Sequence, residues 1–134
     1  MIYDVINPSD SITLEADSFK LACVATLLVG KGRYGLEDED GTLVLPIFLM
    51  GGLDDWWDKH FDKPVAATIE DHKPDLVPIL RTFAVCSPNK RRAILKATNN
   101  DPEALRRYNE EARSSLNDIC GYAFEIADAL EKQE

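Results

Sequence analysis

The sequence has no long hydrophobic run, few cysteines and little positive charge, and each shortage excludes a class of protein. Its longest apolar stretch, residues 42–50 (TLVLPIFLM), is less than half of the about 20 residues that a membrane-spanning helix needs. The 3 cysteines are an odd number without a CxxC spacing, which indicates reduced thiols in a cytosol. The opening MIYDVINPSD lacks the basic and apolar segments of a secretory signal. We therefore expect a cytoplasmic protein without a membrane partner.

The sequence has 15 basic and 24 acidic residues, which gives a net charge of −9. We therefore expect no binding to DNA or RNA, because both are polyanions. The charge is uneven, because residues 89–113 hold 7 basic and 4 acidic side chains whereas residues 1–88 hold 7 and 15. A basic island in an acidic chain favours recognition of a small anion by local contacts. Alternatively, these lysines and arginines lie on a solvent-exposed helix face and recognise no ligand.

The composition, 45% apolar and 29% charged over 134 residues, is that of one globular domain spanning residues 1–134. The pattern predicts an α+β fold, a small antiparallel sheet decorated with helices. The expected elements are a hairpin at 2–6 and 11–15, a helix at 19–30, a hairpin at 34–36 and 42–49, and a helix at 53–61. Four prolines lie in 62–90, where we expect short helices and one strand near 81–86.

A long C-terminal helix is the clearest predicted element. Pro102 follows the cap candidates Asn100 and Asp101 and suits the first helical position. Apolar residues then recur at helical spacing, at Leu105, Tyr108, Ala112, Leu116, Ile119, Ala123, Ile126 and Leu130. This stripe predicts one continuous helix of roughly eight turns.

Several patterns that often carry chemistry fail their requirements here. Residues 30–35 (GKGRYG) match G-x-G-x-x-G, but a dinucleotide loop follows a strand and opens a helix, the reverse of the order predicted here. His60 and His72 lie among carboxylates without a metal-binding spacing. No G-x-S-x-G is present, and Cys23 and Cys120 lie on apolar helical stripes. We predict no catalytic residue, no metal site and no cofactor.

A polar row on the long helix could bind an anion. Arg106, Glu110, Arg113 and Asn117 are spaced 4, 3 and 4 residues apart, which places them on one helix face. Arginine matches phosphate oxygens with paired hydrogen bonds, and an asparagine amide both donates and accepts. Alternatively, Glu110 pairs with both arginines on a wet surface, although a mid-helix asparagine is then harder to explain.

Other residues could complete that site. Arg91 and Arg92 precede the helix and could face the same row. Trp56, Trp57 and Phe83 offer aromatic faces, on which bases stack. Because neighbouring helical side chains point about 100° apart, we also expect the two tryptophans to serve different surfaces, one of them in self-association.

Four segments of the chain resemble one family. They are VINPSD at 5–10, GKGRYGL at 30–36, PIFLMGG at 46–52 and RSSLNDI at 113–119. Together they resemble small phage and prophage proteins, in particular the phage anti-Thoeris sponge family. Members of that family bind the cyclic ADP-ribose-type signal made by a bacterial TIR-domain defence enzyme, and they sequester it without cleaving it.

The resemblance implies a phage counter-defence protein of the host cytoplasm, a homo-oligomer with signal pockets at subunit contacts. It implies that Arg113 and Asn117 contact the ligand, with Arg106 nearby, Arg92 on a phosphate and Phe83 as a stacking ring. Residues 62–90 match no pattern of the family.

Two other functions compete with this cyclic nucleotide sponge. The acidic residues 1–88 could mimic nucleic acid and occupy a basic groove of a defence complex, as an anti-CRISPR-like inhibitor does. A small nucleotide hydrolase is the third hypothesis, but the sequence lacks a convincing metal or nucleophile set.

Overall fold

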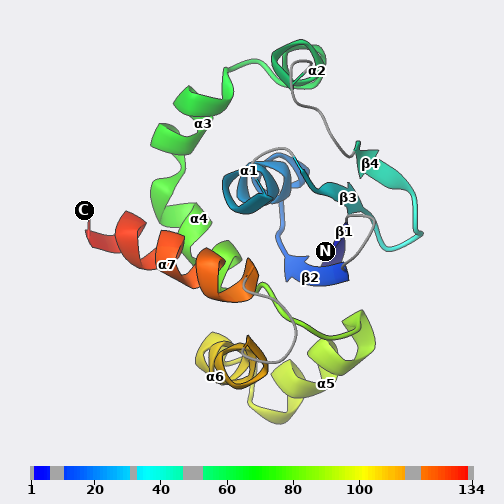
Figure 1. Ribbon diagram of the computed structural model, residues 1–134, viewed down its shortest axis with the longest axis vertical. Coiled ribbons are helices and arrows are strands. Elements are labelled where there is room, and N and C mark those ends of the chain that lie inside the picture. Colours follow the sequence, from blue (N-terminus) through cyan, green and yellow to red (C-terminus); the bar gives the residue numbers. More distant parts are fainter. Residues whose placement is uncertain (1, 7–10, 31–32, 47–52, 114–118, 133–134) are drawn as a thin grey trace.

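The computed structural model describes residues 2–6, 11–30, 33–46, 53–113 and 119–132 (Figure 1). Its strands form a four-stranded antiparallel sheet in the order β2-β1-β3-β4. The strands are β1 (Ile2–Ile6), β2 (Ser11–Glu15), β3 (Gly35–Glu37) and β4 (Leu43–Leu45). The predicted α+β class, with a small antiparallel sheet decorated with helices, is confirmed.

One face of the sheet is apolar because hydrophobic residues alternate along each strand and meet across strands. The cross-strand pairs are Tyr3 with Leu14, Val5 with Ile12 and with Leu36, and Leu36 with Leu45. All of these side chains are at most 2% exposed. The register thus places one continuous apolar surface against the helices.

Seven helices surround this sheet in the described residues. They are α1 (Phe19–Gly30), α2 (Leu53–His60), α3 (Val65–Asp71), α4 (Lys73–Arg81), α5 (Pro88–Ala97), α6 (Pro102–Arg113) and α7 (Ile119–Lys132). Helix α1 is apolar on nearly every side and lies between the sheet and α3, α4 and α7 (Figure 1). A helix that is hydrophobic all round is expected to be buried, and α1 is the centre of the core.

Most predicted elements are present with shorter bounds. Both hairpins are confirmed, with β4 ending at Leu45, immediately before Pro46. Ser18 precedes α1, and its Oγ accepts a hydrogen bond from the Leu21 N–H at 3.4 Å. The strand predicted near 81–86 is reduced to a single bridge between Thr13 and Ala84, which covers part of the outer edge of β2.

The predicted C-terminal helix is confirmed in α7, but the single helix predicted over 102–130 is wrong. It is divided into α6 and α7, which run in different directions in Figure 1. A single straight helix of this length cannot bury all of its apolar residues in one small core. With two helices in different directions, Leu105 of α6 and Ala123 of α7 are both fully buried. The segment 114–118 contains Ser, Asn and Asp, which favour helix caps over helix interiors.

The adjacent tryptophans have different surroundings, as their helical positions require. Trp57 is 1% exposed within the core, and its indole N–H donates to the Lys63 carbonyl. Trp56 packs at the core's edge and stacks on His60, with ring centroids 4.2 Å apart. None of the helices described between residues 19 and 132 combines the length and the apolarity that crossing a membrane would require.

Candidate functional site

Of the residues predicted to form the ligand site, the three whose side chains the structure describes, Phe83, Arg92 and Arg106, do not come together. Phe83 is 0% exposed and belongs to the hydrophobic core, so its ring presents no face to a ligand. The side chain of Arg113, at the end of α6, and the whole of Asn117 lie outside the described residues. Arg106 and Arg92 remain, and they have different surroundings.

Arg106 is engaged by carboxylates, as the alternative interpretation of the polar row expected. Its guanidinium lies 3.6 Å from Glu103, 3.5 Å from Glu110 and 3.8 Å from Asp128. It also lies over the ring of Phe124, 5.7 Å from the centroid. These contacts join α6 to α7, and they indicate a structural role for Arg106.

Arg92, which was predicted to contact a phosphate, lies in a groove. The groove, called here the Arg92 groove, consists of two hollows of about 280 Å³ and about 550 Å³ that share Ile2, Glu39 and Arg92. It runs between α5, the start of β1 and the turn that joins β3 to β4. The larger hollow has the volume of an ordinary small-molecule site.

The lining of the groove offers both donors and acceptors. The larger hollow adds the ammonium of Lys96 and the amide of Asn100, with Leu95 and Pro102 as apolar walls. The smaller hollow adds the carboxylates of Asp4 and Asp38 and the amide of Asn89. The carboxylate of Glu15 also lines the larger hollow, so a bound molecule would meet cationic and anionic groups there and further carboxylates in the smaller hollow.

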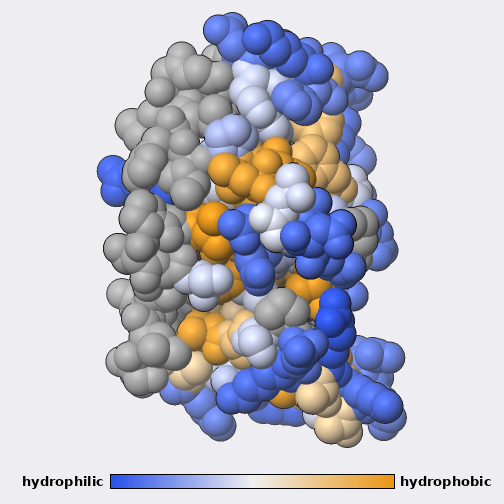
Figure 2. Space-filling model, turned by 90° about the vertical axis from the view of Figure 1, so that its right-hand side faces the viewer, coloured by the Kyte–Doolittle hydropathy of each residue, from blue (hydrophilic) through white to orange (hydrophobic). Residues whose placement is uncertain are grey.

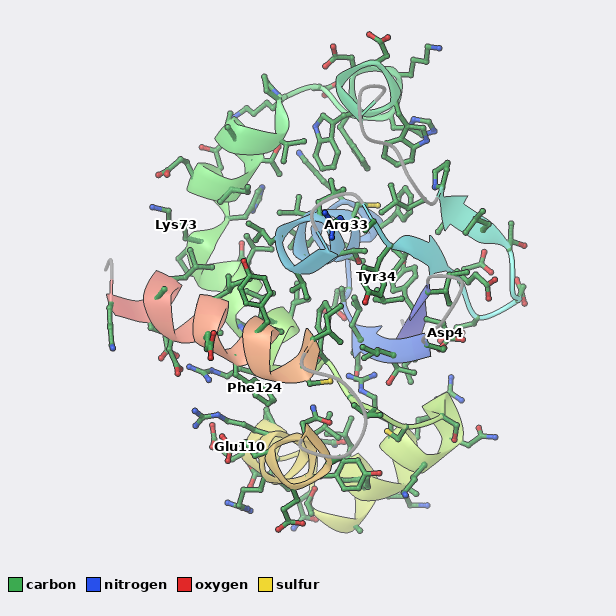
Figure 3. The ribbon with its side chains drawn as sticks, viewed as in Figure 1. Asp4, Arg33, Tyr34, Lys73, Glu110 and Phe124 are labelled. Carbon is green, nitrogen blue, oxygen red and sulfur yellow. The ribbon has the colours of Figure 1, made fainter. Side chains whose placement is uncertain are left out.

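Figure 3 separates this groove from the Arg106 cluster. Asp4 lies at the sheet on the right of the view, whereas Glu110, a partner of Arg106, lies on α6 at the lower left (Figure 3). The side that carries β4, seen face-on in Figure 2, is mostly hydrophilic, with apolar side chains showing in its middle. Arg106 lines neither hollow of the Arg92 groove.

A buried ion pair supports the groove from below. Arg91 is 0% exposed and donates from Nη2 to a carboxylate oxygen of Glu15 at 3.0 Å, and Glu15 lines the larger hollow. Burial lowers the pKa of Arg91, while the charge of Glu15 opposes that shift. Its Nε and Nη1 have no hydrogen-bond partner among the described residues. Arg91 thus holds α5 on the sheet and leaves its neighbour Arg92 facing outward.

The connection between α5 and α6 places Asn100 at the rim. Asn99 and Asn100 have φ of 57° and 60°, the left-handed region, which asparagine adopts more readily than most residues. The Asn100 N–H donates to the Leu95 carbonyl at 2.6 Å and closes the end of α5. This tight turn brings Lys96, Asn100 and Pro102 to one wall of the larger hollow.

Carboxylates are crowded at the sheet end of the groove. Asp4 lies directly opposite Glu37 across β1 and β3. Burial first, and the charge of Glu37 second, raise the pKa of Asp4 above the usual range of an aspartate. Like charges directly opposite in a sheet are destabilising, so this end of the sheet is under electrostatic strain.

A further hollow of about 430 Å³ lies between α4 and the ends of α6 and α7, where Arg81 lines it with Glu103 and Glu131. Arg81 donates from Nη2 to Asp128 and to Glu131, at 2.8 Å in each case. Its guanidinium is therefore largely occupied in holding α4 to α7. This hollow is the weaker candidate for binding an anion.

Comparisons with protein-family models, with curated proteins and with solved structures found no match for this chain. The site therefore has to be judged on its own geometry. Sequence reasoning selected Arg92 but missed Glu39 and Asn100, which complete the groove. The Asn99–Asn100 doublet and the charged turn at 37–40 were the available signals, since both are typical of tight turns.

Proposed function

We propose that the protein is a non-catalytic binding protein that captures a cyclic ADP-ribose-type signal and sequesters it. In this proposal it acts in phage counter-defence against Thoeris-type immunity, in the host cytoplasm and as a homo-oligomer. The family resemblance supplies the biological setting. The observation that carries the chemistry is the position of Arg92 between two hollows with polar linings.

The groove fits the polar groups of such a ligand. A cyclic ADP-ribose isomer carries phosphates, which arginine, lysine and asparagine donors bind, and Arg92, Lys96 and Asn100 supply these donors. Its ribose hydroxyls can donate to carboxylates, and Asp4 and Asp38 supply acceptors in the smaller hollow. Donors and acceptors for both kinds of ligand group therefore line the groove, with the Glu15 carboxylate as a further acceptor in the larger hollow.

Two of the three described thiols, those of Cys23 and Cys120, are unsuited to catalysis. Burial raises the pKa of Cys23 and that of Cys120 to about 12 each, so both remain protonated thiols at neutral pH. A protonated, buried thiol is a poor nucleophile. These two cysteines are core residues.

Arg113 and Asn117 stay in the proposal on the strength of the resemblance. Arg113 ends α6, the helix that follows α5 after a short turn. In an oligomer, these residues could complete a pocket that a single chain leaves open.

The decisive experiment is ligand capture and release. The protein is incubated with cyclic ADP-ribose isomers from a TIR-domain enzyme, separated from free ligand, and denatured by heat. Intact isomer in the supernatant is the expected result. Recovery of linear ADP-ribose as the main product would show an enzyme instead, and failure to retain any isomer would refute the proposal.

Substitutions then locate the pocket. Arg92→Ala and Arg113→Ala are each expected to weaken capture by about ten- to a hundred-fold, because a charge-assisted phosphate contact contributes about 1.5–3 kcal/mol. Asn117→Ala is expected to weaken it less. The matched control is Arg107→Ala, which removes an exposed arginine of α6. Equal affinity in Arg92→Ala and in the control would place the pocket outside this groove.

The crowded carboxylates at the sheet end support a second candidate, an acidic inhibitor that mimics nucleic acid. Asp4 and Glu37 are opposed across two strands, and Asp38, Glu39 and Asp40 follow in the turn. Such a surface would bind a basic groove of a defence complex. Charge reversal of Asp40 would weaken that interaction and leave nucleotide capture intact, which separates the two functions.

A further inference from the structure

Glu39 already occupies the donors that an anionic ligand would use. Its Oε1 accepts a hydrogen bond from the backbone N–H of Ile2 at 3.1 Å and lies 3.5 Å from the Arg92 guanidinium. Glu39 and Arg92 line both hollows, and Ile2 lies at the same junction. The carboxylate thus lies where the two hollows meet.

Arg92 holds this carboxylate weakly. The side chains of Arg92 and Glu39 are 51% and 46% exposed, and their contact is long. An exposed ion pair of this kind contributes little free energy. Arg92 also donates to Asn89 Oδ1 at 3.4 Å, a contact that keeps the guanidinium at the groove when Glu39 leaves.

The turn that carries Glu39 does not depend on this contact. Asp38 Oδ1 accepts from the N–H groups of Asp40 and Thr42, each at 2.9 Å, and Gly41 adopts φ of 79°. The Asp38 N–H and the Thr42 carbonyl close the turn at 3.0 Å. Glu39 can therefore change its partner without loss of the turn.

We propose that the Ile2 N–H and the Arg92 guanidinium form an anion subsite for a phosphate group, and that the Glu39 carboxylate is its resident competitor. The identification of the phosphate as part of a cyclic nucleotide rests on the proposed function. A phosphate offers more acceptor oxygens than a carboxylate and binds arginine through paired hydrogen bonds. It displaces Glu39 and takes both donors.

The charges around the subsite determine from which side the phosphate enters. Asp4 and Asp38 line the smaller hollow and repel an anion. The larger hollow is lined by Lys96 and Asn100, and its further carboxylate, Glu15, is paired with Arg91 at 3.0 Å. The phosphate therefore approaches through the larger hollow. Glu39 lowers the affinity for the phosphate in two ways. Its contact with Arg92 has to be broken, and its negative charge then remains near the bound phosphate.

Glu39→Gln tests the competition. Glutamine keeps an oxygen that accepts from the Ile2 N–H and removes the charge that competes for Arg92. Calorimetric titration with the captured cyclic ADP-ribose isomer is expected to show about three- to ten-fold tighter binding than the wild type, from a lost exposed ion pair and lost like-charge repulsion. Asp40→Asn is the matched control, with the same charge change one residue along the same exposed turn, and it is expected to change affinity less than two-fold.

The double variant Arg92→Ala/Glu39→Gln separates competition from general electrostatics. If Glu39 competes for Arg92, the glutamine gives a smaller gain once Arg92 is absent, because only the lost like-charge repulsion then remains. An equal gain with and without Arg92, or an equal gain in Asp40→Asn, would overturn the proposal. Unchanged affinity in Glu39→Gln, with the fold intact by circular dichroism, would overturn it as well.

The titration is repeated with inorganic pyrophosphate, which tests the anion subsite apart from the identity of the signal. If the wild type captures no cyclic ADP-ribose isomer but Glu39→Gln binds pyrophosphate more tightly than the wild type, the proposed function fails and the subsite stands. If the isomer is captured and Glu39→Gln binds neither probe more tightly, the subsite fails and the proposed function stands.

Discussion

Each of the two arginines between α4, α6 and α7 contacts at least two carboxylates, whereas Arg92 in its groove contacts one. In the first region, Arg81 and Arg106 share Asp128, and Arg81 adds Glu131 at 2.8 Å. In the second, the carboxylates of Asp4 and Glu37 face each other, and Arg92 has one long contact with Glu39. The ion pairs of the first region stabilise the packing of the helices, and the second region retains interactions that a ligand can improve.

This contrast explains why arginine content alone does not locate the site. Arg81, Arg91 and Arg106 are all committed to carboxylates of other elements, with side chains 11%, 0% and 29% exposed. Arg92 is 51% exposed and loosely held. An arginine that can change partners is the better candidate for an anion contact.

The largest expected effect is a loss of stability in the first region, between α4 and α7. Arg81→Ala removes the ion pairs with Asp128 and Glu131, and we expect the free energy of unfolding to fall by about 2–3 kcal/mol. The estimate is below that for a fully buried pair, because the two carboxylates are 44% and 52% exposed and water screens them. Urea denaturation measures the change, with Arg92→Ala as the matched arginine, expected to cost less than about 0.5 kcal/mol. Equal losses would remove the distinction between the two regions.

A smaller effect is expected at Arg106. Arg106→Ala should lower the free energy of unfolding by up to about 1 kcal/mol, because its contacts with Glu103, Glu110 and Asp128 are long and partly exposed. Ligand capture should stay within two-fold of the wild type. A capture defect as large as that of Arg92→Ala would restore the polar row of α6 as the binding surface.

The smallest effect has the opposite sign. Asp4→Asn is expected to raise the free energy of unfolding by about 0.5 kcal/mol at pH 7, since it removes a like charge opposite Glu37. Because the folded-state pKa of Asp4 is raised, its carboxylate opposes folding above that pKa. The penalty disappears as the pH falls through the raised pKa toward the ordinary value of an aspartate. Thermal melts at pH 7 and in the acid range should show the gain of Asp4→Asn at pH 7 alone, and a gain that persists in acid would contradict this cause.

Local signals predicted much of the fold. The pattern of residues in the two strands predicted the first hairpin. In the structure, Tyr3 pairs with Leu14 and Val5 with Ile12, and this register buries all four side chains. The helix predicted at 19–30 is present as α1, and its apolar composition explains its central position, since a helix with no polar face is expected to be buried. These features depend on residues close in sequence.

The division between α6 and α7 could not be predicted from the spacing of the apolar residues. That spacing indicates a helix, but it does not show where the helix axis changes direction. The site depends still more on distant residues. Glu39 and Arg92 are separated by 53 positions, and Glu15 and Arg91 by 76. Sequence reasoning treated Arg91 and Arg92 alike, but helical geometry turns one inward and the other outward. Phe83 was selected for its ring, and the fold placed that ring in the core.

The most direct test of the central claim is an NMR titration of the ¹⁵N-labelled protein with cyclic ADP-ribose isomers from a TIR-domain enzyme. The account predicts that the largest shifts fall on the backbone amide of Ile2, the side-chain amides of Asn89 and Asn100, and the Arg92 Nε–H, while the Arg81 Nε–H stays in place. Shifts confined to Arg81 and its neighbours on α4 and α7, or no shift at saturating ligand, would contradict it.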